Sequence, residues 1–511
     1  MPDRCDFCTS SSTRNKEQWT QCDGCDGWVH DVCVSITDPA SYAKYHCPKC
    51  TKTKGPSLYK RQSKRKKIDI DYAAMHSGNV DMSLRTRHVH SSRFTDTAAS
   101  AQDKEPFKRV SGTELTLEWA QSPEGLSEPV IIPKEHKDTL GMHIPEDLTV
   151  RQVAEAVGME CPVEVINVVS QNGSPGWNMG KWTEYYEDIE GRDTILNVIS
   201  LEISASDLGK SIVRPTLVRE LDLVDKVWPT DTEAARDSKP QVSLYALMSV
   251  EDSFTDFHID FAGSSVFYHV LKGRKSFMFI RPTARNLAAY SQWCLSTDQN
   301  VVFLPDVMAP DTEIYTVHLS PGDTMYIPSG WIHAVHSPQD SLVIGGNFIT
   351  PLNTKTQIDI AGIEVKTKVP MKFRYPLFAG VMWYYVLQLL DDPKRLHAMS
   401  NKEREGLNSV AEYLNGFIKT MSPTMKDLQY RRFVANFPLE IRPYPGTTLL
   451  KYCALLDFYP KGVQETADID IRRKKADSKD KPKSESPFPE QPVLPEAKIE
   501  LKEEIQTTHN Y

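Results

Sequence analysis

The sequence has no apolar run long enough to span a bilayer, and no basic N-terminal stretch followed by an apolar segment. These are the features that indicate a membrane span or a secretion signal, and a helix needs about 20 mostly apolar residues to cross a bilayer. At 511 residues, the chain is long enough for about three domains of ordinary size. We therefore expect an intracellular protein without a membrane segment, in a reducing compartment.

Cysteine is scarce over most of the chain and concentrated at its start. Seven of the ten cysteines lie within the first fifty residues, and the later ones are Cys161, Cys294 and Cys453. In an intracellular protein, such clustering indicates metal binding rather than disulfide bonds. We therefore expect the N-terminal segment to fold around metal.

Metal donors fill the first fifty residues in four closely spaced pairs. The pairs are Cys5 and Cys8, Cys22 and Cys25, His30 and Cys33, and Cys47 and Cys50. Thiolate and imidazole ligands suit zinc, and eight donors are enough for two tetrahedral ions. Four protein ligands close each site to substrate and water, so both zinc ions would be structural. Folding of this segment would then depend on metal binding.

Acidic residues are absent between Pro39 and Ile68, although the whole chain has a net charge of −8. The same stretch contains the basic run KRQSKRKK at residues 60–67. Such a block can contact the phosphates of DNA, be bound by a nuclear import receptor, or form a solvated linker. These three interpretations remain open at the level of sequence.

A run of apolar and β-branched residues in the middle of the chain contains unexpected polar side chains. The stretch DFHIDFAGSSVFYHVLKGRKSF, residues 256–277, predicts buried sheet but includes His258, Asp260 and Lys275. Side chains alternate along a strand, so we expect His258 and Asp260 on one face. His333, in the segment GWIHAV, supplies a third donor. Two imidazoles and one carboxylate suit iron(II) and leave positions open for a cosubstrate and oxygen, although zinc also accepts this set.

The residues around these donors favour iron. Lys275 should lie on the next strand, which we expect to begin near the LKGR turn, and Thr255 precedes the first donor by three residues. A buried lysine needs an anion beside it. The distal carboxylate of 2-oxoglutarate would supply that anion, bound by the ammonium and the threonine hydroxyl, while its keto acid end chelates the iron.

The N-terminal order of four cysteines, one histidine and three cysteines resembles that of a plant homeodomain (PHD) finger. A RING finger is the alternative, but the histidine in fifth place and Trp28 two residues before it favour the PHD finger. The resemblance implies that Trp19 and Trp28 are aromatic walls that bind a methylated lysine through cation–π contacts, most simply trimethylated lysine 4 of histone H3. Alternatively, either tryptophan packs the small core. The resemblance also implies a cross-braced ligand set: Cys5, Cys8, His30 and Cys33 for one zinc, and Cys22, Cys25, Cys47 and Cys50 for the other.

Four blocks further along the chain resemble the JmjC domain, the double-stranded β-helix (cupin) iron oxygenase of histone demethylases. They are similar in particular to the fungal JmjC histone demethylation protein 1 family and its animal lysine-36 demethylase relatives. The blocks are LNVISLE (196–202), TDFHIDFAGSSVFYHVLKG (255–273), IPSGWIHAVHSPQDSLVIGGN (327–347) and KFRYPLF (372–378). The resemblance implies that His258, Asp260 and His333 bind iron, and that 2-oxoglutarate is contacted by Thr255, Lys275, Asn197 and Tyr268.

The resulting fold prediction is a mostly β catalytic core, a double-stranded β-helix with flanking helices, between a zinc-binding PHD finger and a C-terminal helical segment. The apolar run at residues 376–390 predicts a buried helix that is too short to span a membrane. The polar composition from about Asp468 predicts a disordered tail. We expect the following segments: PHD finger 1–53, basic and polar linker partly packed on the catalytic domain 54–128, JmjC domain 129–365, helical domain 366–462 and tail 463–511.

The resemblance also implies a reaction. Iron(II), 2-oxoglutarate and oxygen would hydroxylate an N-methyl group of lysine, which then leaves as formaldehyde. The implied substrate is mono- or dimethylated histone H3 lysine 36, which makes the histone H3 tail and the nucleosome the expected partners and the nucleus the expected location. Related PHD–JmjC proteins act on lysines 9 and 27 instead. Two alternatives are a JmjC protein hydroxylase with the same donors and a chromatin-binding adaptor whose catalysis is dispensable.

Overall fold

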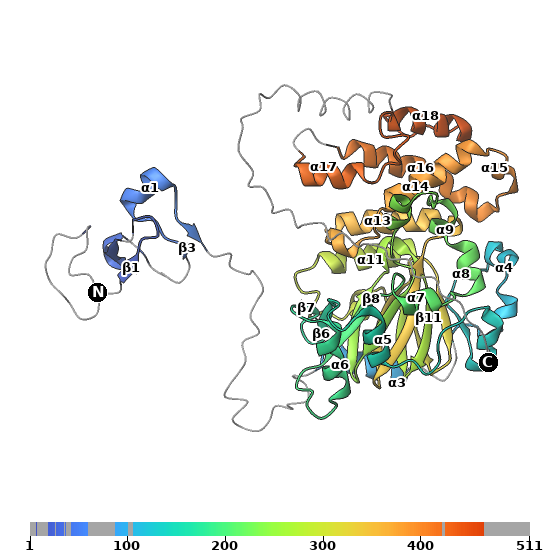
Figure 1. The fold of residues 1–511 in the computed structure, drawn as a ribbon, viewed down its shortest axis with the longest axis horizontal. Helices are drawn as coiled ribbons and strands as arrows, with labels where there is room; N and C mark the ends of the chain where they lie inside the picture. Colours follow the sequence, from blue (N-terminus) through green and yellow to red (C-terminus); the bar gives the residue numbers. More distant parts are fainter. Residues whose placement is uncertain are drawn as a thin grey trace, which may run out of the picture. The chain divides into compact units, whose positions relative to one another are not determined.

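The computed structural model describes residues 7, 19–25, 27–34, 36, 42–59, 87–100, 106–421 and 425–463. The chain divides into two compact units, residues 1–80 and residues 81–511 (Figure 1). Cys5 and Cys8, the basic block at residues 60–67 and residues 464–511 of the predicted tail lie outside the described residues.

The N-terminal unit is built from short elements around a small core. Its elements are β1 (Trp19–Gln21), β2 (Trp28–His30), η1 (Asp31–Val34), β3 (Tyr42–Lys44), α1 (Pro48–Lys54) and β4 (Leu58–Tyr59). Strand β1 pairs with β2, and β3 with β4, both antiparallel. The buried residues include Cys22, Cys47 and Cys50 beside Val29 and Tyr45. A core this small needs additional stabilisation such as bound metal.

Two antiparallel sheets form the centre of the larger unit, which confirms the predicted β-rich class. The larger sheet has the strand order β5-β14-β11-β16-β9-β8-β6-β7, and the smaller has β10-β15-β12-β13. In chain order, the larger sheet contains β5 (Val130–Ile132), β6 (Val165–Asn167), β7 (Asn172–Ser174), β8 (Leu196–Glu202), β9 (Tyr245–Ser249), β11 (Ser265–Lys272), β14 (Thr324–Ile327) and β16 (Ser341–Phe348). The smaller sheet contains β10 (Ser253–His258), β12 (Lys275–Ile280), β13 (Ile314–Leu319) and β15 (Ile332–Ser337).

The chain passes repeatedly from one sheet to the other, which brings residues distant in sequence to one cavity. The turn in LKGR carries the chain from β11 in the larger sheet to β12, which begins at Lys275 as predicted. Gly273 has a positive φ of 73° in this turn, and a Cβ atom there would overlap the carbonyl of Asp340. Only glycine fits both conditions.

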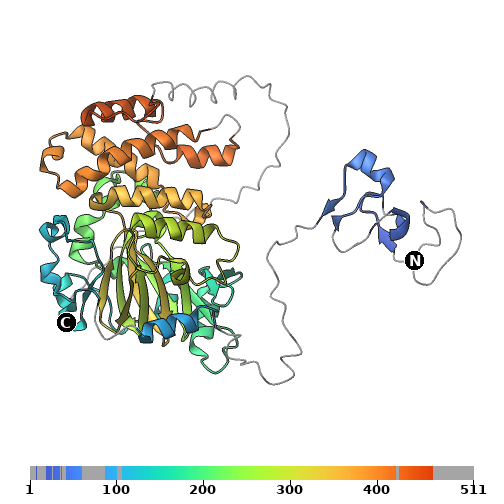
Figure 2. The same cartoon turned by 180° about the vertical axis from the view of Figure 1, so that it is seen from behind.

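Short helices cover the sheets and the connections between strands. They are α3 (Ser91–Ser100), η4 (Gly112–Glu114), α4 (Leu117–Gln121), η5 (Lys134–Leu140), α5 (Val150–Val157), α6 (Met179–Glu187), α7 (Asp207–Ser211), α8 (Thr216–Leu221), α9 (Leu223–Val227), α10 (Glu233–Asp237), η6 (Phe261–Gly263), α11 (Ala284–Leu295) and α12 (Leu304–Val307). Helix α3, which the sequence did not predict, lies against the strands in the view of Figure 2.

The C-terminal part is helical, as predicted, and forms a layer beside the sheets (Figure 1). Its elements are η7 (Pro351–Asn353), α13 (Thr354–Lys366), η8 (Met371–Phe373), α14 (Phe378–Asp391), α15 (Arg395–Ala398), α16 (Asn401–Lys419), α17 (Asp427–Val434) and α18 (Pro445–Leu456). Helix α14 is the expected buried helix, with Val381, Met382 and Trp383 fully buried. Among the described helices, none combines the length and apolarity that a membrane span requires.

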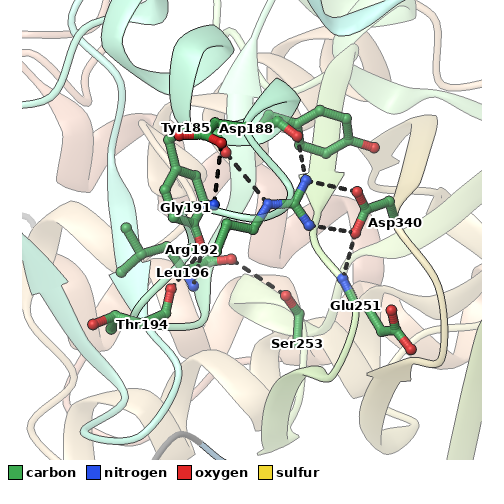
Figure 3. A network of polar contacts seen from close by, with 10 residues as sticks. Tyr185, Asp188, Gly191, Arg192, Thr194, Leu196, Glu251, Ser253 and Asp340 are labelled. Carbon is green, nitrogen blue, oxygen red and sulfur yellow. Dashed lines mark hydrogen bonds and ion pairs between the residues drawn. The ribbon is translucent and has the colours of Figure 1, made fainter.

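A half-buried arginine connects three turns at one end of the sheets. Arg192, in the connection from α6 to β8, donates to both carboxylate oxygens of Asp340 at 2.8 and 2.7 Å and to the carbonyl of Tyr185 (Figure 3). Asp340 lies in the β15–β16 turn and also accepts from the amide of Glu251 in the β9–β10 turn, at 2.7 Å. The ends of β8, β9, β10 and β15 are thereby held together, and these strand ends carry much of the site described below.

Candidate functional site

A cavity of about 820 Å³ is lined by strands of both sheets and by α13. The seven residues that the sequence predicted for iron and 2-oxoglutarate all line it: Asn197, Thr255, His258, Asp260, Tyr268, Lys275 and His333. The structure therefore brings together residues that span more than a hundred positions of the chain.

Three metal-donor side chains meet in this cavity. Strands β10 and β15 are antiparallel neighbours whose register sets His258 opposite His333, and the two ring centroids are 4.3 Å apart. Nε2 of His333 lies 3.9 Å from Oδ2 of Asp260, and one donor atom from each of the three residues lies within 4.8 Å of the others. These separations are compatible with three ligands on one ion.

Hydrogen bonds fix the orientation of both imidazoles. Nδ1 of His258 bonds the carbonyl of Asp256 at 2.9 Å, and Nδ1 of His333 bonds the carbonyl of Trp331 at 3.1 Å. A neutral imidazole that donates from Nδ1 has its lone pair on Nε2, the usual arrangement for a metal ligand. Burial, with a smaller contribution from His258, lowers the pKa of His333 to about 4, so this ring is neutral at physiological pH.

The local backbone differs from the regular strand that we expected for His258 and Asp260. Strand β10 ends at His258, and Asp260 lies beyond it, before η6. The chain turns there because Ala262 and Gly263 have positive φ values of 47° and 58°. The β10–β15 register also shifts between Thr255 and His258. Residues three apart, such as Thr255 and His258, point to opposite faces of a regular strand. The bulge between them therefore allows both Thr255 and His258 to face the cavity.

Asn347, which we did not predict from the sequence, orients the carboxylate of Asp260. Its Nδ2 atom donates to Oδ1 of Asp260 at 3.3 Å and to Oγ of Ser264 at 2.9 Å. Asn347 is buried in β16, whose other residues are mostly apolar or glycine. A buried asparagine needs hydrogen-bond partners. The sequence signal that could have indicated Asn347 is therefore an asparagine within the apolar and glycine-rich stretch LVIGGNF.

Lys275 lies at the inner end of a chain of polar side chains. Its Nζ atom donates to Oγ of Ser249 at 2.6 Å and to Oγ of Ser337 at 2.7 Å. Ser249 donates to Oδ1 of Asn197 at 2.7 Å, and Nδ2 of Asn197 donates to the hydroxyl of Thr255 at 3.3 Å. Single serines at strand ends gave no sequence signal, so the structure adds Ser249 and Ser337 to the candidate site.

The charge on Lys275 is not compensated by the described part of the chain. The side chain is buried, and burial alone lowers the pKa of its ammonium to about 7. None of the described carboxylates forms an ion pair with it. A buried ammonium of this kind favours an anionic ligand in the adjoining cavity.

Tyr268 completes the predicted set. It lies in β11 between β14 and β16, is buried, and contacts the ring of Phe277 edge-on at 5.1 Å. Burial raises the pKa of its phenol, so the hydroxyl keeps its proton and can donate a hydrogen bond into the cavity.

Four cysteines converge in the N-terminal unit. One Sγ atom from each of Cys22, Cys25, Cys47 and Cys50 lies within 4.8 Å of the others. Burial raises the pKa of the Cys22 thiol, but the amides of Cys47 and Gly24 outweigh this and lower it to about 7, which favours the thiolate that zinc binds. Of the other predicted set, Nδ1 of His30 lies 3.8 Å from Sγ of Cys33, while Cys5 and Cys8 are outside the described residues.

Comparison with known proteins identifies the family. A PHD finger matches residues 5–50, a cupin-like domain matches residues 214–352 and a Jumonji helical domain matches residues 352–443. The protein named JmjC domain-containing histone demethylation protein 1 in Yarrowia lipolytica is 87% identical over 507 residues, which cover 99% of each chain. The chain belongs to this family of JmjC histone demethylation proteins.

More distant relatives match about three quarters of this chain. The JmjC histone demethylation protein 1 of Debaryomyces hansenii is 42% identical over 75% of this chain and 78% of its own. Histone lysine demethylase PHF8 of Danio rerio is 38% identical over 77% of this chain and 36% of its own length. The resemblance inferred from the sequence is confirmed for both the PHD finger and the JmjC fold.

The two predicted reader tryptophans lie on one face of the small β1–β2 ladder in the PHD finger. The register sets Trp19 opposite His30 and Gln21 opposite Trp28, so the tryptophans are diagonal neighbours. Diagonal neighbours are roughly 7–8 Å apart, within reach of two aromatic walls. Trp28 is 37% exposed, whereas Trp19 is half-buried with its ring edge-on to His30 at 3.8 Å.

A third group of donor side chains reaches the cavity described above, because Asp256 is one of its lining residues. It consists of His88, His90 and Asp256. Hydrogen bonds account for much of its geometry, because His90 Nδ1 bonds Asp256 at 3.1 Å and its amide donates to Nδ1 of His88 at 3.2 Å. His88 and His90 fall within residues 54–128, which we expected to be a linker partly packed on the catalytic domain, and we did not predict this group from the sequence.

Proposed function

We propose that the chain is an iron(II)- and 2-oxoglutarate-dependent histone lysine demethylase acting on mono- and dimethylated lysine 36 of histone H3. One observation carries the proposal, namely that three metal donors and an uncompensated buried lysine face the same cavity. Family membership supports the reaction class, since relatives bear the names histone demethylation protein 1 and histone lysine demethylase.

The donor set fits iron(II). His258, Asp260 and His333 would be its ligands, a two-histidine, one-carboxylate set that leaves positions open for a cosubstrate and oxygen. Both rings already donate from Nδ1 to backbone carbonyls, which leaves Nε2 as the donor atom. Asn347 holds the carboxylate of Asp260 in place.

The polar chain around Lys275 fits 2-oxoglutarate. The ammonium and the Thr255 hydroxyl would bind its distal carboxylate, with Asn197 and Tyr268 as further contacts. Ser249 and Ser337 hold the ammonium in a fixed position before the ligand arrives, which reduces the entropy lost on binding. The keto acid end would then face the three donors.

Iron with 2-oxoglutarate and oxygen supplies the oxidation of an N-methyl C–H bond, and the hydroxymethyl product releases formaldehyde. The chain itself would bind the cosubstrate, orient the methyl-lysine and exclude water. Two zinc ions would stabilise the PHD finger, held by Cys5, Cys8, His30 and Cys33 and by Cys22, Cys25, Cys47 and Cys50.

The partner would be the histone H3 tail of a nucleosome, in the nucleus. Trp19 and Trp28 would bind methylated lysine 4 through cation–π contacts, and the basic block at residues 60–67 would contact nucleosomal DNA. We retain the proposed segments 1–53, 54–128, 129–365, 366–462 and 463–511 as the working division of the chain.

A stoichiometric assay tests the reaction class. With a histone H3 peptide dimethylated at lysine 36, we expect succinate and formaldehyde to form together in equal amounts, since each methyl group removed consumes one 2-oxoglutarate. Succinate with a peptide that gains oxygen but releases no formaldehyde would indicate a protein hydroxylase. No succinate with any methylated histone peptide would favour a chromatin-binding adaptor.

A further inference from the structure

The segment of residues 87–100 docks on the strand that carries the predicted iron ligand His258. Arg87 pairs with Asp252 at 2.5 Å, immediately before β10, and His90 Nδ1 bonds Oδ2 of Asp256 within β10 at 3.1 Å. Arg93 bonds both carboxylate oxygens of Asp306 in α12. We call residues 87–100 the docked segment.

Apolar contacts bury the middle of the docked segment. His88 stacks on Phe254 with ring centroids 5.1 Å apart, and Phe94 meets the same ring edge-on at 5.7 Å. His90 lies edge-on to Phe303 at 5.5 Å. Phe94 and His90 are both fully buried, so the docked segment is an integral part of the larger unit.

Asp256 lies at the bulge of β10 and has partners outside the β10–β15 ladder. The β10–β15 register shifts between Thr255 and His258, so Asp256 and Phe257 have no regular pairing in the ladder. The amide of Asp256 instead donates to Oε1 of Gln171 at 3.3 Å, while its carboxylate accepts from the amide of Phe257 at 2.9 Å through Oδ1 and bonds His90 through Oδ2. These contacts, rather than the sheet, hold the bulge in place.

The carbonyl of Asp256 orients the imidazole of His258. Nδ1 of His258 bonds this carbonyl at 2.9 Å, so the direction of Nε2 depends on the orientation of the peptide at Asp256. Removing a group that hydrogen-bonds to a metal ligand and orients it typically weakens metal affinity by about 10–100-fold. The bond from His90 to the Asp256 side chain is one residue further from the metal. Its removal should therefore weaken metal affinity by an amount near the lower end of this range.

We propose that His90 is a positioning residue that acts through Asp256 to aim His258 at the metal. The inference rests on the proposed function, because it takes His258 as an iron ligand. The docked segment, which precedes the catalytic domain in sequence, therefore contributes to the affinity of the iron site without touching the iron or the cosubstrate.

Two substitutions at His90 separate hydrogen bonding from packing. His90→Phe keeps a ring against Phe303 but removes the donor to Asp256, whereas His90→Asn keeps a donor at the position of Nδ1 and loses the ring. Gln171→Leu removes the side-chain acceptor of the Asp256 amide, which lies outside the docked segment, together with the donor to the carbonyls of Val168 and Phe254. Arg93→Ala is the matched control, because it removes an ion pair of the same segment whose side chains are 49% and 43% exposed.

The readout is anaerobic titration of the full-length protein with iron(II) in the presence of 2-oxoglutarate. The visible charge-transfer absorption of the chelate reports binding, and thermal unfolding of each variant checks its fold. We expect His90→Phe to raise the dissociation constant for iron(II) by about tenfold. Gln171→Leu should raise it in the same direction, and His90→Asn and Arg93→Ala should remain close to the unsubstituted protein.

Two results would overturn the inference. One is an unchanged dissociation constant for His90→Phe, and the other is equal weakening by His90→Asn and His90→Phe, which would mean that packing alone matters. Failure of the proposed function would look different, since the unsubstituted protein would then give no charge-transfer absorption with iron(II) and 2-oxoglutarate.

Discussion

Lys275 shows how burial and ligand binding are connected at the scale of single residues. Its ammonium is held by two serine hydroxyls, and burial lowers its pKa to about 7, so a large fraction is neutral in the free protein near physiological pH. An anionic ligand favours the charged form. Binding of 2-oxoglutarate should therefore be accompanied by proton uptake.

This linkage predicts a pH dependence of cosubstrate binding. Below pH 7 the lysine is already charged, whereas each further pH unit above 7 reduces the charged fraction about tenfold. The dissociation constant for 2-oxoglutarate, measured by anaerobic calorimetry with iron(II), should thus increase from pH 7 to 9. The Lys275→Met protein should bind 2-oxoglutarate weakly, and its dissociation constant should change little between pH 7 and 9. A dissociation constant for the unsubstituted protein that stays flat from pH 7 to 9 would contradict the assignment.

At the scale of secondary-structure elements, the Arg192 network joins the strand ends around the cosubstrate cavity (Figure 3). Arg192→Ala leaves the carboxylate of Asp340 without its bidentate partner, and we expect the free energy of unfolding to fall by about 2 kcal/mol. Weaker binding of 2-oxoglutarate should follow, because β8 and β9 carry Asn197 and Ser249. Urea unfolding and calorimetry measure the two effects.

Arg151→Ala is the control for this prediction. Arg151 pairs with Glu187 at the end of the neighbouring helix α6, but their side chains are 48% and 44% exposed, so the loss of stability should be much smaller than for Arg192→Ala. Equal losses for the two variants would mean that the Arg192 network has no special role.

Periodicity and composition predicted the buried sheet at residues 256–277, the start of β12 near the LKGR turn and the buried helix α14. They did not predict the bulge before His258 or the end of β10, because both depend on contacts with Gln171, His90 and β15. Helix α3 was missed for a similar reason. Its sequence is polar overall, and a single ring, Phe94, with two histidines before the helix supplies much of its packing.

For the site itself, residues with distinctive chemistry were found from the sequence, and residues with ordinary chemistry were not. The spacing of His258 and Asp260 and the isolated Lys275 were visible as polar groups in apolar segments. Ser249, Ser337 and His90 became candidates only through their contacts, since serine and histidine at such positions are compatible with many structures.

At the scale of the whole molecule, the proposed function places a histone reader and an oxygenase on one chain. If Trp28 forms part of the methyl-lysine cage, Trp28→Ala should weaken binding of an H3 peptide trimethylated at lysine 4 by about 2 kcal/mol, roughly 30-fold. Activity on nucleosomes that carry this mark should fall, whereas activity on a short peptide around lysine 36 should not change. Peptide binding and nucleosome activity that are both unaffected would contradict the reader assignment.

The central claim is that the three donors in the cavity support removal of methyl groups from histone lysine. Mass spectrometry of a panel of methylated histone H3 peptides, incubated with the full-length protein, iron(II), 2-oxoglutarate and ascorbate, tests it most directly. The account predicts loss of one or two methyl groups from the lysine 36 peptides, and no loss with the His258→Ala protein. Peptides that keep every methyl group, or equal loss with both proteins, would contradict it.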